Sequence, residues 1–271
     1  MRFHPLRALV SVVLSMVMQA VLAQSVKTVL LEELTWTELR GQVQAGKTTI
    51  IVPIGGTEQS GPYVALGKHN ARVKVLAQRI AEGLGNAIVA PVIAYVPEGS
   101  YAPPTSHMRF PGTITVPDDV FEKTLESAAN SFKVHGFTNI VFLGDHGGYQ
   151  NDVRHAVVQL NKAWAGSGAR AFAPPEYYGT SSEGYAQILR QHGVLDNEIG
   201  THAGLADTSL QLAVAPQMVR LDRLRSASKP GAADGVYGGD PRRSSVALGQ
   251  LGTEAIVSRA IEAIRKDSAG R

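Results

Sequence analysis

The chain alternates short, almost wholly apolar runs with longer segments in which apolar residues recur at helical spacing. Short apolar runs bounded by turn residues are typical of strands buried on both faces, whereas apolar positions three and four apart predict amphipathic helices. The repeated strand-then-helix order predicts a mostly parallel central sheet with helices on both faces, a three-layer α/β/α domain. The predicted strands cover residues 50–54, 87–93, 140–143 and 169–173, and the predicted helices cover residues 70–84, 117–135, 150–165, 181–191 and 244–265.

The N-terminal segment, residues 1–23, departs from this alternation. Arg2 and Arg7 precede an apolar stretch without acidic residues that ends in Val-Leu-Ala. This pattern predicts a secretory signal peptide that is cleaved after Ala23. An uncleaved membrane anchor is the alternative, although the apolar run is short for a span of about 20 residues. We therefore expect residues 24–271 to form one domain that is periplasmic or secreted and has no membrane association after cleavage.

The composition allows a globular enzyme and narrows its chemistry. The chain has 271 residues, 44% of them hydrophobic and 18% charged, which is enough for one substantial core. Its formal net charge of +3 falls to +1 when the two arginines of the signal peptide are removed, so we expect no nucleic-acid partner. The absence of cysteine excludes disulfides, thiolate ligands and a cysteine nucleophile. A bound metal must therefore be held by His, Asp and Glu.

Polar clusters follow the apolar runs. The stretch GGTEQSGPYVALGKHN, residues 55–70, follows the first predicted strand, and LGDHGGYQND, residues 143–152, includes the end of the third. Because ligands of parallel sheets bind at the carboxyl ends of the strands, we expect these clusters to meet there. The glycine-rich turn at residues 147–148 matches neither GxxxxGK[ST] nor GxGxxG, the two common phosphate-binding patterns. A third cluster, GTHAGLADTSLQLAVAP at residues 200–216, contains Asp207, which is also suited to a simple helix N-cap.

Together these segments resemble the creatininase (creatinine amidohydrolase) family. Its members share an acid-Gln-His-Gly-Pro-His loop, an Asn-Gly-His turn and a later His-Ala-Gly-x-x-Glu-Thr-Ser segment. The resemblance implies an α/β/α fold, metal-dependent opening of a cyclic amide or cleavage of a related C–N bond, and a homo-oligomer, often a hexamer. The matching segments read EQSGPY at 58–63, GDHGG at 144–148 and HAGLADTS at 202–209, and HMRFPGTITV at 107–116 and GGDP at 238–241 are also similar.

The resemblance implies a metal site with an altered ligand set. In dinuclear members the loop acid, the loop His, a following Asp and the His of the turn bind metal, and the Asp bridges two ions. Glu58 and His146 keep the family's residue types, but Ser60 replaces the loop His and His69 replaces the bridging Asp. An imidazole nitrogen binds one ion, so we expect a single divalent ion on Glu58, His69 and His146. Two histidines and a carboxylate suit zinc, with manganese or iron as alternatives.

Further roles follow from the same resemblance. His202 matches the family's catalytic histidine and is suited to general acid/base transfer to the leaving nitrogen. Asp207 is expected to act in catalysis, either as a fourth ligand or by orienting the metal-bound water. We expect Tyr63, His107 and Asp145 to line the substrate pocket.

The expected activity is hydrolysis of a cyclic amide or related non-peptide C–N bond of a small molecule, by attack of hydroxide formed on the metal. The long segment at residues 96–113, rich in Gly, Pro and Ser, is suited to covering the pocket. Structural roles remain open for His69, His146 and His202. An exported small-molecule-binding protein with the same fold and a degenerate metal site is the alternative function.

Overall fold

The computed structural model describes residues 27–269, so the expected signal peptide, residues 1–23, lies outside the described residues. A parallel four-stranded sheet with the order β2-β1-β3-β4 forms the centre of the domain. This arrangement confirms the predicted fold class. The strands are β1 (Thr49–Ile54), β2 (Ala87–Val89), β3 (Asn139–Gly144) and β4 (Arg170–Phe172).

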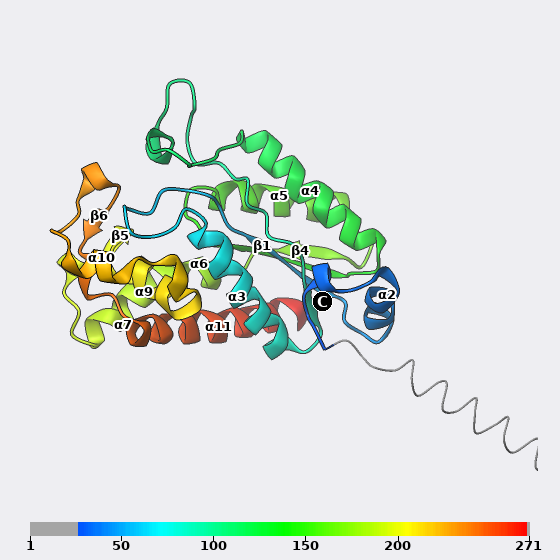
Figure 1. Ribbon diagram of the computed structural model, residues 1–271. Coiled ribbons are helices and arrows are strands. Elements are labelled where there is room, and N and C mark those ends of the chain that lie inside the picture. Colours follow the sequence, from blue (N-terminus) through cyan, green and yellow to red (C-terminus); the bar gives the residue numbers. More distant parts are fainter. Residues whose placement is uncertain (1–26, 270–271) are drawn as a thin grey trace, which may run out of the picture.

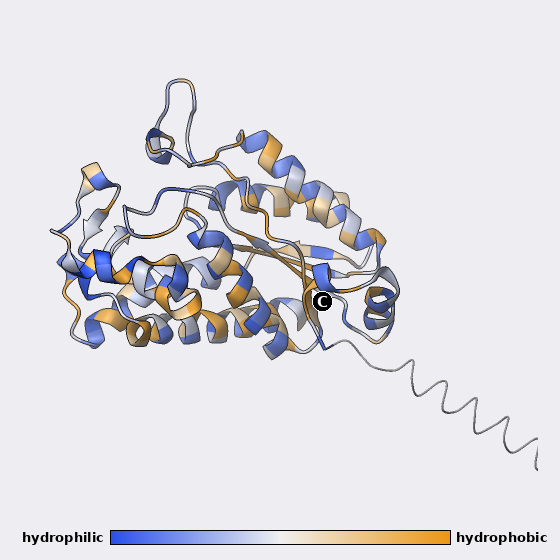
Figure 2. Ribbon diagram, in the orientation of Figure 1, coloured by the Kyte–Doolittle hydropathy of each residue, from blue (hydrophilic) through white to orange (hydrophobic). Residues whose placement is uncertain are grey.

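Long helices cover the two faces of the sheet (Figure 1). Successive side chains of a strand point to opposite faces, so Ile51 packs on one side and Ile50 and Val52 pack on the other. Figure 2 shows the strands as the most apolar part of the molecule, with apolar stripes on the helices around them. The first face is covered by α3 (Lys68–Leu84) and α11 (Val246–Ala269), with α9 (Leu205–Val214) packed against both, and the second by α4 (Asp118–Val134) and α5 (Gln150–Ala163).

The start of α3 differs from the prediction in a way that matters for the site. The predicted helix begins at Asn70, whereas α3 begins at Lys68 after Gly67. Lys68, His69 and Arg72 therefore all project from the first two turns, and all three are buried. Because residues four apart share a helix face, Lys68 and Arg72 point in the same direction.

The second predicted strand, residues 87–93, is also shorter than expected. β2 ends at Val89, and the chain touches the sheet once more through a bridge between Ile54 and Ile93. The chain then leaves the sheet as a long excursion before α4 (Figure 1). This excursion contains a short 3₁₀ helix, Ser106–Arg109.

The remaining elements surround the carboxyl edge and the ends of the sheet. A π-helical turn, Thr180–Gly184, replaces the start of the helix predicted for residues 181–191. The antiparallel pair β5 (Gly200–His202) and β6 (Tyr237–Gly239) was not predicted. The other helices are α2 (Trp36–Gln44), α6 (Pro175–Gly179), α7 (Tyr185–Gln191), α8 (Asp196–Ile199) and α10 (Leu221–Ser226), and further 3₁₀ turns cover Leu31–Glu33, Pro216–Met218, Ala232–Asp234 and Pro241–Arg243. Within residues 27–269, none of the helices combines the length and apolarity that crossing a membrane requires.

Candidate metal site and pocket

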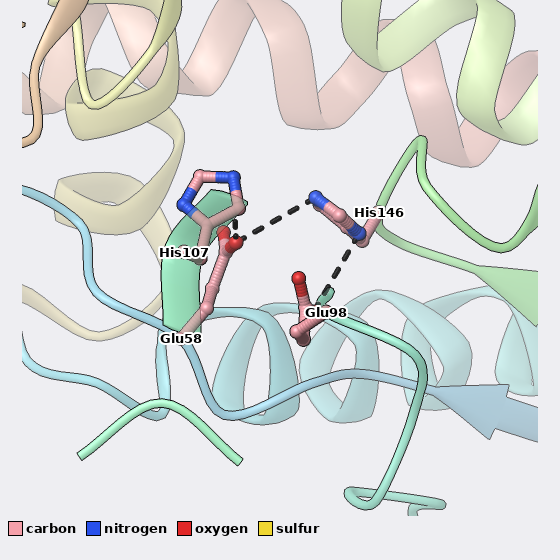
Figure 3. Close-up of side chains that lie close together, drawn as sticks. All are labelled: Glu58, Glu98, His107 and His146. Atoms are coloured by element: carbon pink, nitrogen blue, oxygen red, sulfur yellow. Dashed lines mark ion pairs between the residues drawn. The ribbon is translucent and has the colours of Figure 1, made fainter. Parts of the chain in front are cut away.

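Four side chains with metal-binding groups meet at the carboxyl edge of the sheet (Figure 3). Glu58 comes from the loop after β1, Glu98 and His107 from the excursion after β2, and His146 from the turn after β3. The carboxyl ends of parallel strands share one edge, which is why segments so distant in sequence converge. Glu58 and Glu98 are buried, and the two histidines are partly buried.

The spacing of these groups suits a single cation. Glu58 Oε2 lies 3.4 Å from His107 Nε2 and 3.6 Å from His146 Nε2. His146 Nδ1 lies 3.6 Å from Glu98 Oε1, and one ligand atom from each of the four residues lies within 4.8 Å of the others. Ligands about 2.1 Å from a tetrahedral ion are themselves about 3.4 Å apart. The four groups therefore approach the separation of ligands around one ion.

The two carboxylates provide the second reason to place a cation here. Glu58 Oε2 and both carboxylate oxygens of Glu98 are buried without a hydrogen-bond partner. Burial, and then the charge of Glu58, raises the pKa of Glu98 to about 9. A buried carboxylate without a partner is costly, and a divalent ion between the two would remove that cost. The residues present thus fit a metal ion.

His69 lies beside this group but is already bonded on both sides. Its Nε2 lies 2.7 Å from Glu58 Oε1 and its Nδ1 lies 2.6 Å from Asp145 Oδ2. Burial alone would raise the pKa of Glu58 and Asp145, but the cations beside them outweigh burial, so both pKa values are lowered. Arg72 Nη2 also lies 3.1 Å from His69 Nδ1, so both ring nitrogens are already engaged by neighbouring side chains. The structure therefore places His69 as a bridge and not within the group of four, in contrast to the predicted ligand set.

A buried ionic network extends from this bridge along α3. Lys68 Nζ hydrogen-bonds Asp207 Oδ2 and lies 3.4 Å from Glu58 Oε1. Arg72 donates to Asp207 Oδ1 at 2.6 Å and to Asp145 Oδ2 at 2.9 Å. Burial would raise the pKa of Asp207, but the charges of Lys68 and Arg72 hold it well below its usual range. Both oxygens of Asp207 thus accept hydrogen bonds, and the residue also lines the pocket beside the site, so its role as a ligand or catalytic group stays a prediction.

Asp145 and Tyr63, both predicted to line the substrate pocket, have contrasting positions. Asp145 lines the pocket, but its oxygens accept from His69, Arg72 and the Tyr177 hydroxyl, the last at 3.0 Å. It is therefore a partner of the network. Tyr63 packs against a small apolar cluster around Leu212, Val219 and Leu224 and does not line the pocket.

His107 and His146 of the four-residue group line a pocket of about 540 Å³. Lys68 and Arg72 of α3, Tyr178 and His202 also line it. His202 Nε2 donates to the backbone carbonyl of Gln59 at 2.9 Å. Burial, and then the charge of Lys68, lowers the pKa of His202 to about 3. His202 is therefore uncharged at neutral pH, and its other nitrogen, Nδ1, lies 3.6 Å from Glu58 Oε1.

Sequence comparison assigns this architecture to a family. The family model for creatininase, described as creatinine amidohydrolase, matches residues 32–264. The protein belongs to the creatininase family. Creatinine amidohydrolase of Pseudomonas putida is 28% identical over 205 residues, which cover 73% of this chain and 76% of the relative. A mycofactocin precursor peptide peptidase of Mycolicibacterium smegmatis is 26% identical over 193 residues, which cover 69% of this chain and 66% of the relative.

Solved creatininases share the fold. One crystal structure of creatinine amidohydrolase superposes with a TM-score of 0.74 at 23% identity, covering 90% of this chain and 100% of the solved chain. Solved creatininases include a manganese form and a Zn–Zn form. Family membership and the four-residue group identify the protein as a metal-dependent amidohydrolase.

Within this creatininase-family fold, the structure brings together part of the predicted site and adds residues that the sequence reasoning missed. Glu58 and His146 meet as expected, and His107 joins them as a metal-binding group. Glu98 was missed because it lies in a segment without periodicity, where only its position after a strand hinted at a role. Lys68 and Arg72 were missed as well, although an arginine on the apolar face of a helix was a usable signal.

Proposed function

We propose that this protein hydrolyses a cyclic amide, or a related non-peptide C–N bond, of a small molecule, with one divalent ion held by Glu58, Glu98, His107 and His146. The observation that carries the proposal is the group of four metal-binding side chains, two of which line the pocket, with three buried carboxylate oxygens lacking partners. A pocket of about 540 Å³ is within the size range of sites for small ligands.

The ionic network supports one ion per chain. Lys68 Nζ lies 3.4 Å from Glu58 Oε1, so a cation already pairs with one oxygen of Glu58, while the other oxygen is the one near His107 and His146. His69, at the position where the resemblance implies a bridging Asp, already contacts two carboxylates. A second ion beside the first would meet the Lys68 ammonium and a histidine whose two nitrogens are engaged. Two imidazoles and two carboxylates suit zinc, or manganese or iron with added water.

The side chains divide the work of hydrolysis. When bound, the ion would polarise the scissile carbonyl and activate a water molecule. His202, uncharged at neutral pH, would take a proton from the attacking water at Nδ1 and give it to the nitrogen that leaves as the C–N bond breaks. Its Nε2–H stays hydrogen-bonded to the backbone carbonyl of Gln59, and this bond holds the ring in place. Lys68 and Arg72 would keep Asp207 ionised throughout.

The test joins metal content with turnover. Elemental analysis of the purified protein should find close to one divalent ion per chain, and a chelator should remove both the ion and the hydrolysis of cyclic amides. Zinc or manganese should restore activity. Tight binding of two ions would refute the single-ion site, and cleavage of linear peptides without any cyclic amide would refute the substrate class. Binding of a small molecule without turnover would favour the binding-protein alternative.

A further inference from the structure

The Gln59 side chain lies between His107, which belongs to the four-residue group, and His202, which lines the pocket. It is buried, and its amide nitrogen is 3.0 Å from His107 Nδ1 and 3.1 Å from His202 Nε2. Its amide oxygen accepts from the backbone N–H of Gly61 at 2.9 Å. One amide thus touches the two imidazoles to which the proposed function gives different tasks.

The surrounding backbone is shaped around this amide. Gly235 has a φ of +78°, and a Cβ there would lie 2.0 Å from Gln59 Oε1. The backbone N–H of Gln59 donates to Thr113 Oγ1 at 3.1 Å, and its carbonyl accepts from His202. A glycine in the left-handed region therefore leaves room for the side chain. The amide is held from several sides and is not a mobile surface group.

The positions of the protons decide what this amide does. An amide NH₂ only donates, so His107 Nδ1 must accept, and the proton of the neutral ring sits on Nε2. That nitrogen faces Glu58 Oε2 at 3.4 Å, and while it carries a proton it has no lone pair for a metal. His202 Nε2 meets a conflict as well, because it faces both the NH₂ of Gln59 and the backbone carbonyl of Gln59, which only accepts.

Rotating the amide by half a turn removes both obstacles. Its oxygen would then accept from His107 Nδ1–H and from His202 Nε2–H. His107 Nε2 would be free to bind a cation, and the proton of His202 would stay on Nε2, leaving Nδ1 as an acceptor. The cost is the hydrogen bond from Gly61, whose N–H would then face the amide NH₂. Metal-binding histidines commonly donate their other N–H to an oxygen acceptor, which is the arrangement this rotation creates.

We infer that Gln59 is a positioning residue that sets the proton positions on His107 and His202, and that its amide oxygen faces both rings when a cation is bound. The inference rests on the proposed function, because it assumes that His107 is a ligand. It links metal binding to the general base: the rotation that frees His107 for the ion also fixes the His202 tautomer whose Nδ1 accepts the proton.

Two substitutions test whether residue 59 must supply a hydrogen-bond acceptor or only a side chain of similar size. In Gln59→Glu, one carboxylate oxygen can accept from Gly61 while the other accepts from both imidazoles, so affinity for Zn²⁺ should equal or exceed that of the wild type. Gln59→Met has a similar length and no acceptor, so affinity should fall about 10- to 100-fold, the usual cost of losing a partner of a ligating histidine. Gln42→Met is the matched control. Gln42 lies on α2 with a buried side-chain oxygen that has no partner, and its substitution should leave affinity unchanged.

A double-mutant cycle tests whether Gln59 affects metal affinity through His107. In a His107→Ala background, Gln59→Met should no longer lower the affinity for Zn²⁺, measured by competition with a chromophoric chelator. Urea unfolding of each metal-free variant separates lost affinity from lost folding. The inference is overturned if Gln59→Glu binds Zn²⁺ as weakly as Gln59→Met, because the amide N–H would then be the required group. It is also overturned if Gln59→Met binds as tightly as the wild type.

Nitrogen-15 NMR of the histidine rings tests the inference apart from the proposed function. In the metal-free wild type, His107 should carry its proton on Nε2, and Gln59→Glu should move that proton to Nδ1. Zinc should move it to Nδ1 in the wild type as well. A His107 tautomer that does not respond to Gln59→Glu would overturn the inference. Failure of the wild type to bind any divalent ion would instead refute the proposed function, while the metal-free spectra would still decide the role of Gln59.

Discussion

Replacing Glu98 by glutamine should change metal-free stability and metal affinity in opposite directions. Both Glu98 oxygens are buried without a hydrogen-bond partner, and burial together with the charge of Glu58 raises the pKa of Glu98 to about 9. In the metal-free protein this group therefore has to remain protonated at neutral pH. Glutamine keeps the shape of the protonated acid and has no proton to lose. The metal-free variant should accordingly be the more stable protein above the pKa of an unfolded glutamate.

The magnitude follows from linkage between pH and folding. The folded pKa lies above the unfolded value of 4.5, so between these values the folded state holds one more proton and its stability falls as pH rises. Each pH unit between the two pKa values lowers the free energy of unfolding of the wild type by about 1.4 kcal/mol. At pH 7 this loss is about 3 kcal/mol, and Glu98→Gln does not suffer it. Below the unfolded pKa the difference disappears. To bind a cation as a carboxylate at pH 7, Glu98 must also release its proton, at a cost of about 3 kcal/mol.

The assay is urea unfolding of chelator-treated protein at pH 5 and pH 8, together with Zn²⁺ affinity at pH 7. The advantage of Glu98→Gln over the wild type should grow by about 4 kcal/mol between the two pH values. The Zn²⁺ affinity of Glu98→Gln should fall more than about 100-fold. Loss of a residue that only hydrogen-bonds a ligand usually lowers metal affinity by about 10- to 100-fold. Glu262→Gln, at an exposed position of α11, is the control for a glutamate without this environment. A stability difference that does not change with pH, or an unchanged affinity, would refute the reasoning.

Three further predictions concern other groups. His202→Ala should retain the ion, by elemental analysis, and slow turnover by about 10²–10⁴-fold, and metal loss equal to that of a ligand variant would place His202 among the ligands. Lys68→Met should lower the unfolding free energy by about 3–5 kcal/mol, because it leaves two carboxylates buried beside an apolar group. Lys74→Met should cost less than about 1 kcal/mol, since its ion pair with Glu32 is half exposed, and equal losses in the two variants would contradict the buried network. N-terminal sequencing of the exported protein should begin at Gln24, whereas a membrane-bound product that starts at Met1 would contradict the signal peptide.

The sequence predicted the sheet well because its signal is local. Each apolar run is short and buried on both faces, and each is followed by a helical period, so the strand-helix order leaves few alternatives. The same order placed Glu58 and His146 at one edge, because each directly follows a strand whose neighbour is the other strand. For these two residues, the topology itself decides that they meet.

Glu98 and His107 could not be placed by the same argument. The chain between β2 and α4 has no period that fixes where its side chains point, and His107 reaches the site only because this segment folds back through a 3₁₀ turn. The contacts that fix it are long-range: Gln59 N–H donates to Thr113 Oγ1, and Glu98 N–H donates to Thr115 Oγ1. Hydrogen bonds of this kind depend on the packed structure and leave no pattern in the sequence.

His69, predicted as a metal ligand, lies in a buried network that the ligand pattern could not show. Three carboxylates of the site are paired with side chains along α3. The carboxylates are Glu58, Asp145 and Asp207, and their partners are Lys68, His69 and Arg72.

Glu98 forms no ion pair with Lys68 or Arg72. Its nearest ionisable nitrogen, His146 Nδ1 at 3.6 Å, belongs to a ring whose pKa is lowered to about 4, first by burial. That ring is uncharged at neutral pH and can offer Glu98 no positive charge. A buried carboxyl group in this position either stays protonated or faces a cation from outside the chain. The carboxylate that was hardest to find in the sequence is therefore the one through which metal binding should be most directly measurable.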